Sequence, residues 1–265
     1  MDKRLGFIGC GNMGGAILMG ALKNNAVSDK DVSVLVKSEK SRQKYADMGI
    51  KVCGDIKELC EASDMLVLAV KPNVAGQVLN EAKPYLSDKA VISIAAGITV
   101  DMLKDMTGGA RVIRTMPNTP ALIGEGAMIV CEETDITAEE KEFTERLFNA
   151  NGTIYTIAER LMDAASAVGG CSPAFVAMFI EAMADGGVRE GLPRALAYSL
   201  AEKAVYGSAK MMLEENMHPG VMKDMVTSPG GTTIEGVGAL EEGGMRAAVM
   251  DCIARCTEKS KRLVK

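Results

Sequence analysis

The sequence predicts an α/β protein with a mostly parallel N-terminal sheet and an all-helical C-terminal domain. Three observations indicate this. Short apolar runs alternate with helical stretches up to residue 157, a glycine-rich turn follows the first run, and no strand pattern appears afterwards. The change in pattern places the boundary near Ala158 and predicts domains 1–158 and 159–265.

The first apolar run, 4–9, leads into glycines at Gly9, Gly11 and Gly14 and a helix that begins near Asn12. This is the spacing of a Rossmann-type dinucleotide-binding turn. Gly9 permits the tight turn, Gly11 lets the backbone approach a pyrophosphate, and Gly14 lets the helix pack closely on its strand. Free N–H groups at the helix start favour a phosphate anion. A plain tight turn is the alternative.

The second strand, 32–36, ends where such a fold discriminates NADP from NAD. An NAD site has an acidic residue there to bind the ribose 2′-hydroxyl. This chain has Lys37 and Ser38, with two more cations close behind, and only Glu39 departs from the pattern. We therefore predict NADP as the cofactor, with NADPH preferred and NADH possible; a solvated charged loop is the alternative.

The rest of this domain alternates strands with helices. Only the stretch 116–125 separates the strand at 111–115 from the next apolar run, which is short for a parallel crossover, so the run at 127–131 is expected to be antiparallel. The other predicted strands lie at 64–70, 90–95 and 153–157, and the helices at 73–83, 99–106 and 137–149.

Ligands of an open α/β sheet bind beyond the carboxyl ends of its strands. The turns at these ends are small or apolar except for Lys71 and Asn118, which suits a nicotinamide ring lying flat against backbone. The predicted cofactor-binding residues are Gly9, Gly11, Asn12, Met13, Gly14, Lys37, Ser38, Ala69, Val70, Lys71, Pro72, Ala96, Gly97 and Asn118.

The helical half begins with an uncharged stretch, 164–180, that is short of a membrane span and interrupted by polar and small residues. We interpret it as part of a helix buried on all sides, kinked at Pro173, and covered by another subunit. Further helices are predicted at 194–215, before Met225, and at 245–262. The chain is therefore expected to form a homodimer or a higher homo-oligomer.

A second candidate site lies between two helices of this half, at 226–235. Two glycines and the hydroxyl residues Ser228, Thr232 and Thr233 precede a helical run, an arrangement that can bind a small carboxylate at the helix N-terminus. Capping of the helix without any ligand is an alternative role that explains these residues equally well.

Composition narrows the function classes. The chain has 265 residues and a net charge of -5, which argues against nucleic acid as a partner, and no membrane association is expected. Seven cysteines at irregular spacing, with no signal peptide, indicate free thiols and a cytoplasmic setting. Cys252 and Cys256 are one helical turn apart, but the chain has a single histidine, so we predict core side chains and no metal site.

The scarcity of candidate proton donors favours an imine over a ketone as the group that is reduced. Ketone reduction needs a proton donor, often His or Lys. The only histidine, His218, is expected to be a surface or capping residue, and the helical stretch 160–186 contains no lysine, unlike the β-hydroxyacid dehydrogenases. A protonated imine already carries the charge that a hydride neutralises.

Over essentially its whole length the chain resembles the pyrroline-5-carboxylate reductase family. The resemblance rests on the glycine turn and on the segments 69–72, 114–120, 182–186, 191–193, 218–220 and 228–233. It implies NAD(P)H-dependent reduction of 1-pyrroline-5-carboxylate to L-proline, the last step of proline synthesis.

The resemblance also implies residue roles. Ser228 and the backbone of Gly231, Thr232 and Thr233 would bind the substrate carboxylate, and the Thr233 hydroxyl, as the catalytic group, would face the ring nitrogen. The helical domain would be a dimerisation domain, with the substrate site where two subunits meet. The segment 169–174 departs from the family's usual Ser-Gly-Ser-Gly-Pro-Ala. Six-membered cyclic imines, or a non-catalytic NADP sensor, are alternative functions.

Overall fold

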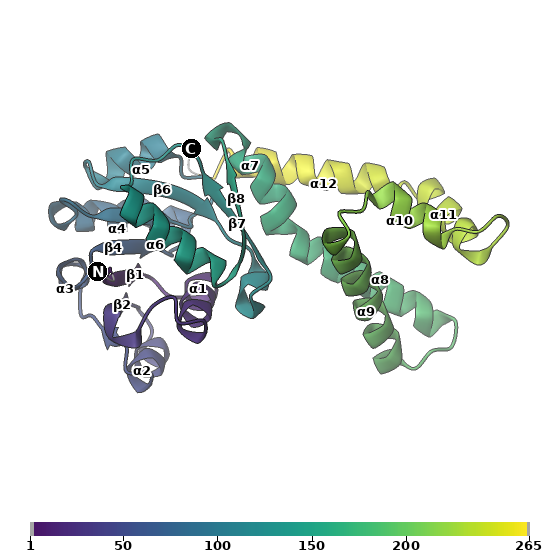
Figure 1. Cartoon of the computed structure of the whole chain (residues 1–265), viewed down its shortest axis with the longest axis horizontal. Helices are drawn as coiled ribbons and strands as arrows, with labels where there is room; N and C mark the ends of the chain where they lie inside the picture. Colours follow the sequence, from purple (N-terminus) through teal and green to yellow (C-terminus); the bar gives the residue numbers. More distant parts are fainter. Residues whose placement is uncertain (1–2, 264–265) are drawn as a thin grey trace. The chain divides into compact units, whose positions relative to one another are not determined.

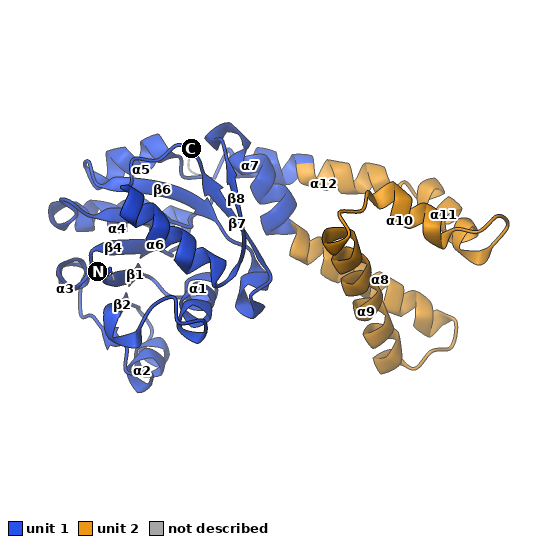
Figure 2. Cartoon of the chain, viewed as in Figure 1, with its two compact units in different colours: residues 1–171, 254–265 blue, residues 172–253 orange. Residues whose placement is uncertain are grey.

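A computed structural model describes residues 3–263 of the chain. The chain forms two compact units (Figure 2), one of Met1–Cys171 with Ala254–Lys265 and one of Ser172–Ile253. The last strand ends at Ile157, as the sequence predicts. The domain boundary near Ala158 follows that change of pattern and remains a prediction.

The first unit contains one eight-stranded sheet in the order β3-β2-β1-β4-β5-β6-β7-β8 (Figure 1). Neighbouring strands are parallel except β6 and β7, which are antiparallel as the short connection predicts. The strands are β1 (Leu5–Ile8), β2 (Val32–Leu35), β3 (Lys51–Val52), β4 (Met65–Leu68), β5 (Ala90–Ser93), β6 (Arg111–Met116), β7 (Gly126–Cys131) and β8 (Gly152–Ile157).

Helices cover both faces of the sheet, so its central strands are buried on both sides and read as continuous apolar runs. One apolar cluster contains side chains of α1, α2 and α6, and the other contains side chains of α3, α4, α5 and α7. These helices are α1 (Asn12–Lys23), α2 (Glu39–Asp47), α3 (Ile56–Ala62), α4 (Pro72–Ala82), α5 (Val100–Thr107), α6 (Ala138–Asn149) and α7 (Met162–Ala165).

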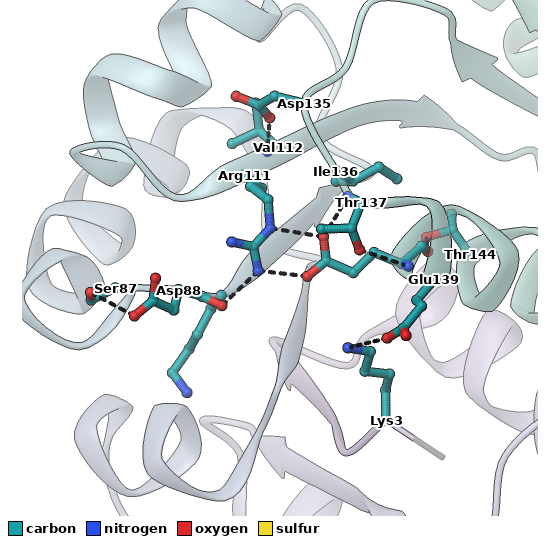
Figure 3. A network of polar contacts seen from close by, with 12 residues as sticks. Lys3, Ser87, Asp88, Arg111, Val112, Asp135, Ile136, Thr137, Glu139 and Thr144 are labelled. Atoms are coloured by element: carbon teal, nitrogen blue, oxygen red, sulfur yellow. Dashed lines mark hydrogen bonds and ion pairs between the residues drawn. The ribbon is translucent and has the colours of Figure 1, made fainter. Parts of the chain in front are cut away.

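The amino end of β6 is closed by a polar network (Figure 3). The guanidinium of Arg111 donates to both carboxylate oxygens of Glu140, at 2.9 and 2.7 Å, and to the carbonyl of Asp88. Glu140 also completes a capping box with Thr137 at the start of α6. The hydrogen-bonding groups of this network are paired with one another. Ligands are therefore expected at the opposite edge of the sheet, where the carboxyl ends of its parallel strands lie.

A second polar cluster connects β6 with the last turns of the chain. Arg114 is buried and its guanidinium contacts Glu159 at 3.2 Å and Asp163 at 2.9 Å. The Ser260 hydroxyl donates to the same Asp163 oxygen at 2.9 Å. Segments on both sides of the second unit in the sequence are thus held against β6.

The second unit is helical. Its helices α8 and α9 pair closely, and among their residues only Ala184, Ala197 and Ala201 are buried. The expectation of a helix buried on all sides is therefore wrong for the single chain. The helices are α8 (Ser172–Arg189), α9 (Arg194–Glu214), α10 (Pro219–Val226), α11 (Thr232–Glu242) and α12 (Met245–Ser260), whose end belongs to the first unit.

The kink expected at Pro173 stays a prediction. A π-helical segment, Ser166–Cys171, ends just before Pro173, the second residue of α8, and such wider turns interrupt the regular hydrogen-bond ladder near a proline. Within the described residues one helical stretch, Glu159–Arg189, is long and apolar enough to cross a membrane by length and composition alone.

Candidate active site

The glycine-rich turn lies where the strand order reverses, between β1 and β4, the usual ligand crevice of such a sheet. Gly9 has φ +77°, and a Cβ there would lie 2.8 Å from the carbonyl oxygen of Ala69. A Cβ at Gly14 would lie 2.8 Å from the Ala69 side chain. Both glycines are required by the close approach of the turn to the end of β4.

Gly11 is the exception. A Cβ built at Gly11 would meet nothing within 4 Å, so space is open beside the backbone. Gly11 is the N-cap of α1 and no side chain caps this helix. The first N–H groups of α1 are therefore available to an anion, as the fit of a pyrophosphate requires.

A cavity of about 310 Å³ adjoins this turn. The structure places five of the predicted cofactor residues around it: Gly9, Gly11, Lys37, Val70 and Lys71. Ser41 also lines the cavity, and the prediction from the sequence, which followed the residues just after the strand as far as Ser38, did not include it.

Ser38 has a structural task besides its predicted role. Its hydroxyl oxygen accepts from the N–H of Ser41 at 3.2 Å and donates to the Ser41 hydroxyl at 2.7 Å, which makes Ser38 the N-cap of α2. The start of α2 thus presents hydroxyls and free N–H groups beside Lys37. These groups suit a phosphate on the ribose 2′-oxygen.

The other predicted cofactor residues follow neighbouring strands. Lys71 is the N-cap of α4, and Pro72 is its first residue. Gly97 has φ +76° just after β5. The Asn118 side chain donates from Nδ2 to the Gly169 carbonyl and accepts at Oδ1 from the Ala127 N–H, both at 2.9 Å. These bonds give Asn118 a structural role beside the predicted one.

The second candidate site is a loop and helix start in the second unit. Gly230 has φ +64°, and Gly231 is the N-cap of α11 without a side-chain cap. A Cβ on Gly231 would lie 2.3 Å from the Ser228 hydroxyl oxygen, so only glycine leaves that hydroxyl in place. Ser228, Thr232 and Thr233 are exposed in the chain. Hydroxyls and free N–H groups gathered at a helix start can bind a carboxylate.

His218 caps a helix, which is one of the two roles expected for it. Its Nδ1 accepts from the N–H of Gly220 at 3.0 Å at the start of α10. Among the described residues, no three His, Cys, Asp or Glu side chains are placed to hold a metal ion.

Comparison with known proteins covers the whole chain. Residues 159–263 match the family described as pyrroline-5-carboxylate reductase dimerisation, and residues 4–97 match one described as NADP oxidoreductase, coenzyme F420-dependent. A pyrroline-5-carboxylate reductase of Escherichia coli K12 is 46% identical over 268 residues, covering 100% of both proteins. The chain belongs to the pyrroline-5-carboxylate reductase family. The enzyme of that name from Methanosarcina acetivorans is 43% identical, over 100% of this chain and 99% of the relative.

A solved structure of this family supports the same fold. Plasmodium falciparum pyrroline carboxylate reductase, determined with NADP bound, superposes with a TM-score of 0.91 and 36% identity, over 100% of this chain and 99% of that one. The chain is thus an oxidoreductase with an NADP-binding domain and a dimerisation domain. The apolar stretch Glu159–Arg189 lies in the part of the chain that matches the dimerisation family. Its apolar surface is exposed in the single chain because a second subunit covers it.

Proposed function

We propose that the chain reduces 1-pyrroline-5-carboxylate to L-proline with NADPH, binding the cofactor at the β1–α1 turn and the substrate at Ser228–Thr233. The single observation that carries this residue assignment is the uncapped start of α11, with Gly231 leaving room for the Ser228 hydroxyl. Family membership supports the reaction, and the open backbone at Gly11 supports the cofactor site.

The substrate carboxylate is bound by the Ser228 hydroxyl and by the backbone N–H groups of Thr232 and Thr233. These N–H groups are the first of α11, have no partner within their helix, and stand at the positive end of its dipole. A carboxylate there replaces the missing cap. Binding the carboxylate fixes where the rest of the ring lies.

The Thr233 hydroxyl faces the ring nitrogen and accepts a hydrogen bond from its N–H in the protonated imine. The bound cofactor supplies the hydride. Because the protonated C=N bond already carries a positive charge, the site needs no strong acid. The residues assigned to it, Ser228, Gly231, Thr232 and Thr233, offer hydroxyls and amides, and Glu235 follows in the first turn of α11.

The active form is a homodimer or a larger assembly, located in the cytoplasm. Large apolar side chains are exposed along α8, α9, α10 and α12 of the single chain, and they suit a subunit interface. All seven cysteines are free thiols in the structure, which fits a reducing compartment.

The test is a cofactor-oxidation assay. Purified protein receives NADPH or NADH with 1-pyrroline-5-carboxylate, with a six-membered piperideine carboxylate, or with small 2- and 3-keto acids. Rapid oxidation with the five-membered imine, and none with the keto acids, is expected. Oxidation with the six-membered ring alone would contradict the substrate assignment, and NADPH binding without any oxidation would favour a sensor.

A further inference from the structure

Tyr45 is the one buried residue of α2, the helix whose start borders the cofactor cavity. Only 1% of Tyr45 is exposed, and its hydroxyl donates to the Cys10 carbonyl at 2.9 Å. Cys10 lies inside the glycine-rich turn, immediately before Gly11. One side chain thus connects α2 with the backbone of the turn.

We propose that the Tyr45 hydroxyl is a positioning group for cofactor binding, because it orients the peptide between Cys10 and Gly11 so that the Gly11 N–H is ready for the diphosphate. The inference rests on the proposed function, and it adds a residue that contacts no ligand.

The physical reason lies in the peptide plane. A trans peptide is rigid, and its C=O and N–H point in opposite directions. Holding the Cys10 carbonyl at one side therefore directs the Gly11 N–H to the other. Among the described residues no group accepts that N–H, and Gly11 lines the cavity. A donor that is already oriented loses less entropy when an anion arrives.

Glycine at position 15 supports this role independently. A Cβ at Gly15 would lie 3.0 Å from the Tyr45 hydroxyl oxygen, and its other neighbour within 4 Å is the Cys10 carbonyl oxygen at 3.8 Å. Gly15 falls outside the three-glycine spacing of the turn. Its missing side chain leaves the space that the hydroxyl needs in order to reach Cys10.

The hydroxyl stays a donor at any ordinary pH. Burial, and then contact with Cys10, raises the pKa of Tyr45 above its usual range. The backbone carbonyl of Cys10 can only accept. The bond therefore has a fixed direction, and the orientation of the peptide does not depend on titration.

The experiment measures cofactor affinity directly, by fluorescence titration of the whole protein with NADPH and with NADH, without imine. Tyr45→Phe keeps the ring and removes the hydroxyl. Both dissociation constants are expected to rise about five- to tenfold, as for one lost hydrogen bond. The two should rise by the same factor, since the diphosphate is common to both cofactors. In the imine assay, the loss should appear as a higher KM for NADPH and not as a higher KM for the imine.

Gly15→Ala provides a second arm. In the parent background the new methyl group crowds the hydroxyl, so the dissociation constants rise as in Tyr45→Phe. In the Tyr45→Phe background the crowded atom is gone, and Gly15→Ala is expected to change affinity less than about twofold. This non-additivity is specific to the proposed contact.

Thr107→Val is the matched control. Thr107 is buried on α5, away from the turn, and its hydroxyl donates to the Leu103 carbonyl at 2.8 Å. The variant loses a comparable buried bond and should bind both cofactors like the parent. The inference is overturned if Tyr45→Phe binds both cofactors normally, weakens only NADPH, or weakens binding no more than Thr107→Val does. It is also overturned if the parent binds neither cofactor. If only the imine assay fails, the proposed function is contradicted. The cofactor titrations would still test the role of Tyr45.

Discussion

The Asn118 amide joins the turn after β6 to the π-helical segment, since its Nδ2 donates to the Gly169 carbonyl at 2.9 Å. Its Oδ1 accepts from Ala127 of β7, so one buried side chain satisfies backbone groups of two further segments. Asn118→Ala is expected to lower the free energy of unfolding by about 2 kcal/mol, because it leaves two partly buried backbone groups unpaired. Imine reduction should fall about tenfold in kcat/KM, because the turn loses its position.

Asn151→Ala is the control for that prediction. Asn151 is fully buried and its amide donates to the Ile17 and Leu147 carbonyls, neither of which lines the cofactor cavity. Thermal unfolding should show a similar loss of stability, while kcat/KM per folded protein stays near the parent. Equal kinetic losses in both variants would mean that Asn118 acts through stability alone.

Thr233→Ala should lower kcat about a hundredfold, the effect of removing one group that contacts the reacting atoms. NADPH affinity should be unchanged, because the cofactor residues lie in the other unit. Thr233→Ser keeps the hydroxyl and should restore most of the rate. Normal turnover by Thr233→Ala would show that the substrate site is assigned wrongly.

Gly231→Ala should raise the KM of the imine. The new Cβ would lie 2.3 Å from the Ser228 hydroxyl oxygen and would force that hydroxyl away from the carboxylate. An increase of about tenfold corresponds to the loss of one charge-assisted hydrogen bond. Gly238→Ala on the same helix is the comparison, because a Cβ there meets nothing within 4 Å and should leave the KM unchanged.

Cofactor choice is tested at the end of β2. Lys37→Glu with Ser38→Asp removes a cation and adds acids, while Asp can still cap α2 in place of the Ser38 hydroxyl. The ratio of kcat/KM for NADPH over NADH is expected to fall at least about tenfold. Lys30→Glu, a charge change away from the cavity, should not alter the ratio. An unchanged ratio in the double variant would refute the role of this strand end.

Stability should depend on pH through Glu140. Burial alone would raise its pKa, but hydrogen bonds from Arg111 and from the Thr137 N–H lower it overall. Because its pKa is lower in the folded state than the ordinary value of 4.5, the ionised Glu140 stabilises the fold at pH values above 4.5. This contribution is lost as the pH falls through the lowered pKa of the folded state. Glu140→Gln should therefore unfold more easily than the parent at pH 7, by about 1–3 kcal/mol. Urea denaturation at pH 7 and pH 3 should show the difference shrinking in acid.

The sheet could be predicted because its central strands are buried on both faces and alternate with helices, a pattern that few other folds produce. β3 was not predicted, because its two residues, Lys51 and Val52, are too few to show an alternation of apolar and polar side chains. The π-helical segment was not predicted either. A π-helix has more residues per turn than an α-helix, and no residue type in Ser166–Cys171 distinguishes the two, since the segment contains small residues that also occur in α-helices.

Sequence reasoning selects residues where backbone geometry restricts the residue type, and the structure shows such a restriction at Gly9, Gly14 and Gly231; their roles in binding stay predictions. It does not find contacts that cross between elements. Tyr45 looks like a surface residue, because the rest of its helix is polar and its carbonyl partner is 35 residues away. The sequence likewise gives no sign that Arg114 pairs with Asp163, which in turn accepts from Ser260.

The Ser260–Asp163 bond has a consequence for synthesis of the chain on the ribosome. Most N-terminal domains fold while later residues are still being added. Here the first unit includes a segment that begins at Ala254, so its last partners are synthesised after the whole second unit, Ser172–Ile253. Until Ser260 has been added, Asp163 lacks its hydroxyl partner, so a chain cut after Ile253 would contain the second unit and still lack the Ser260 contact.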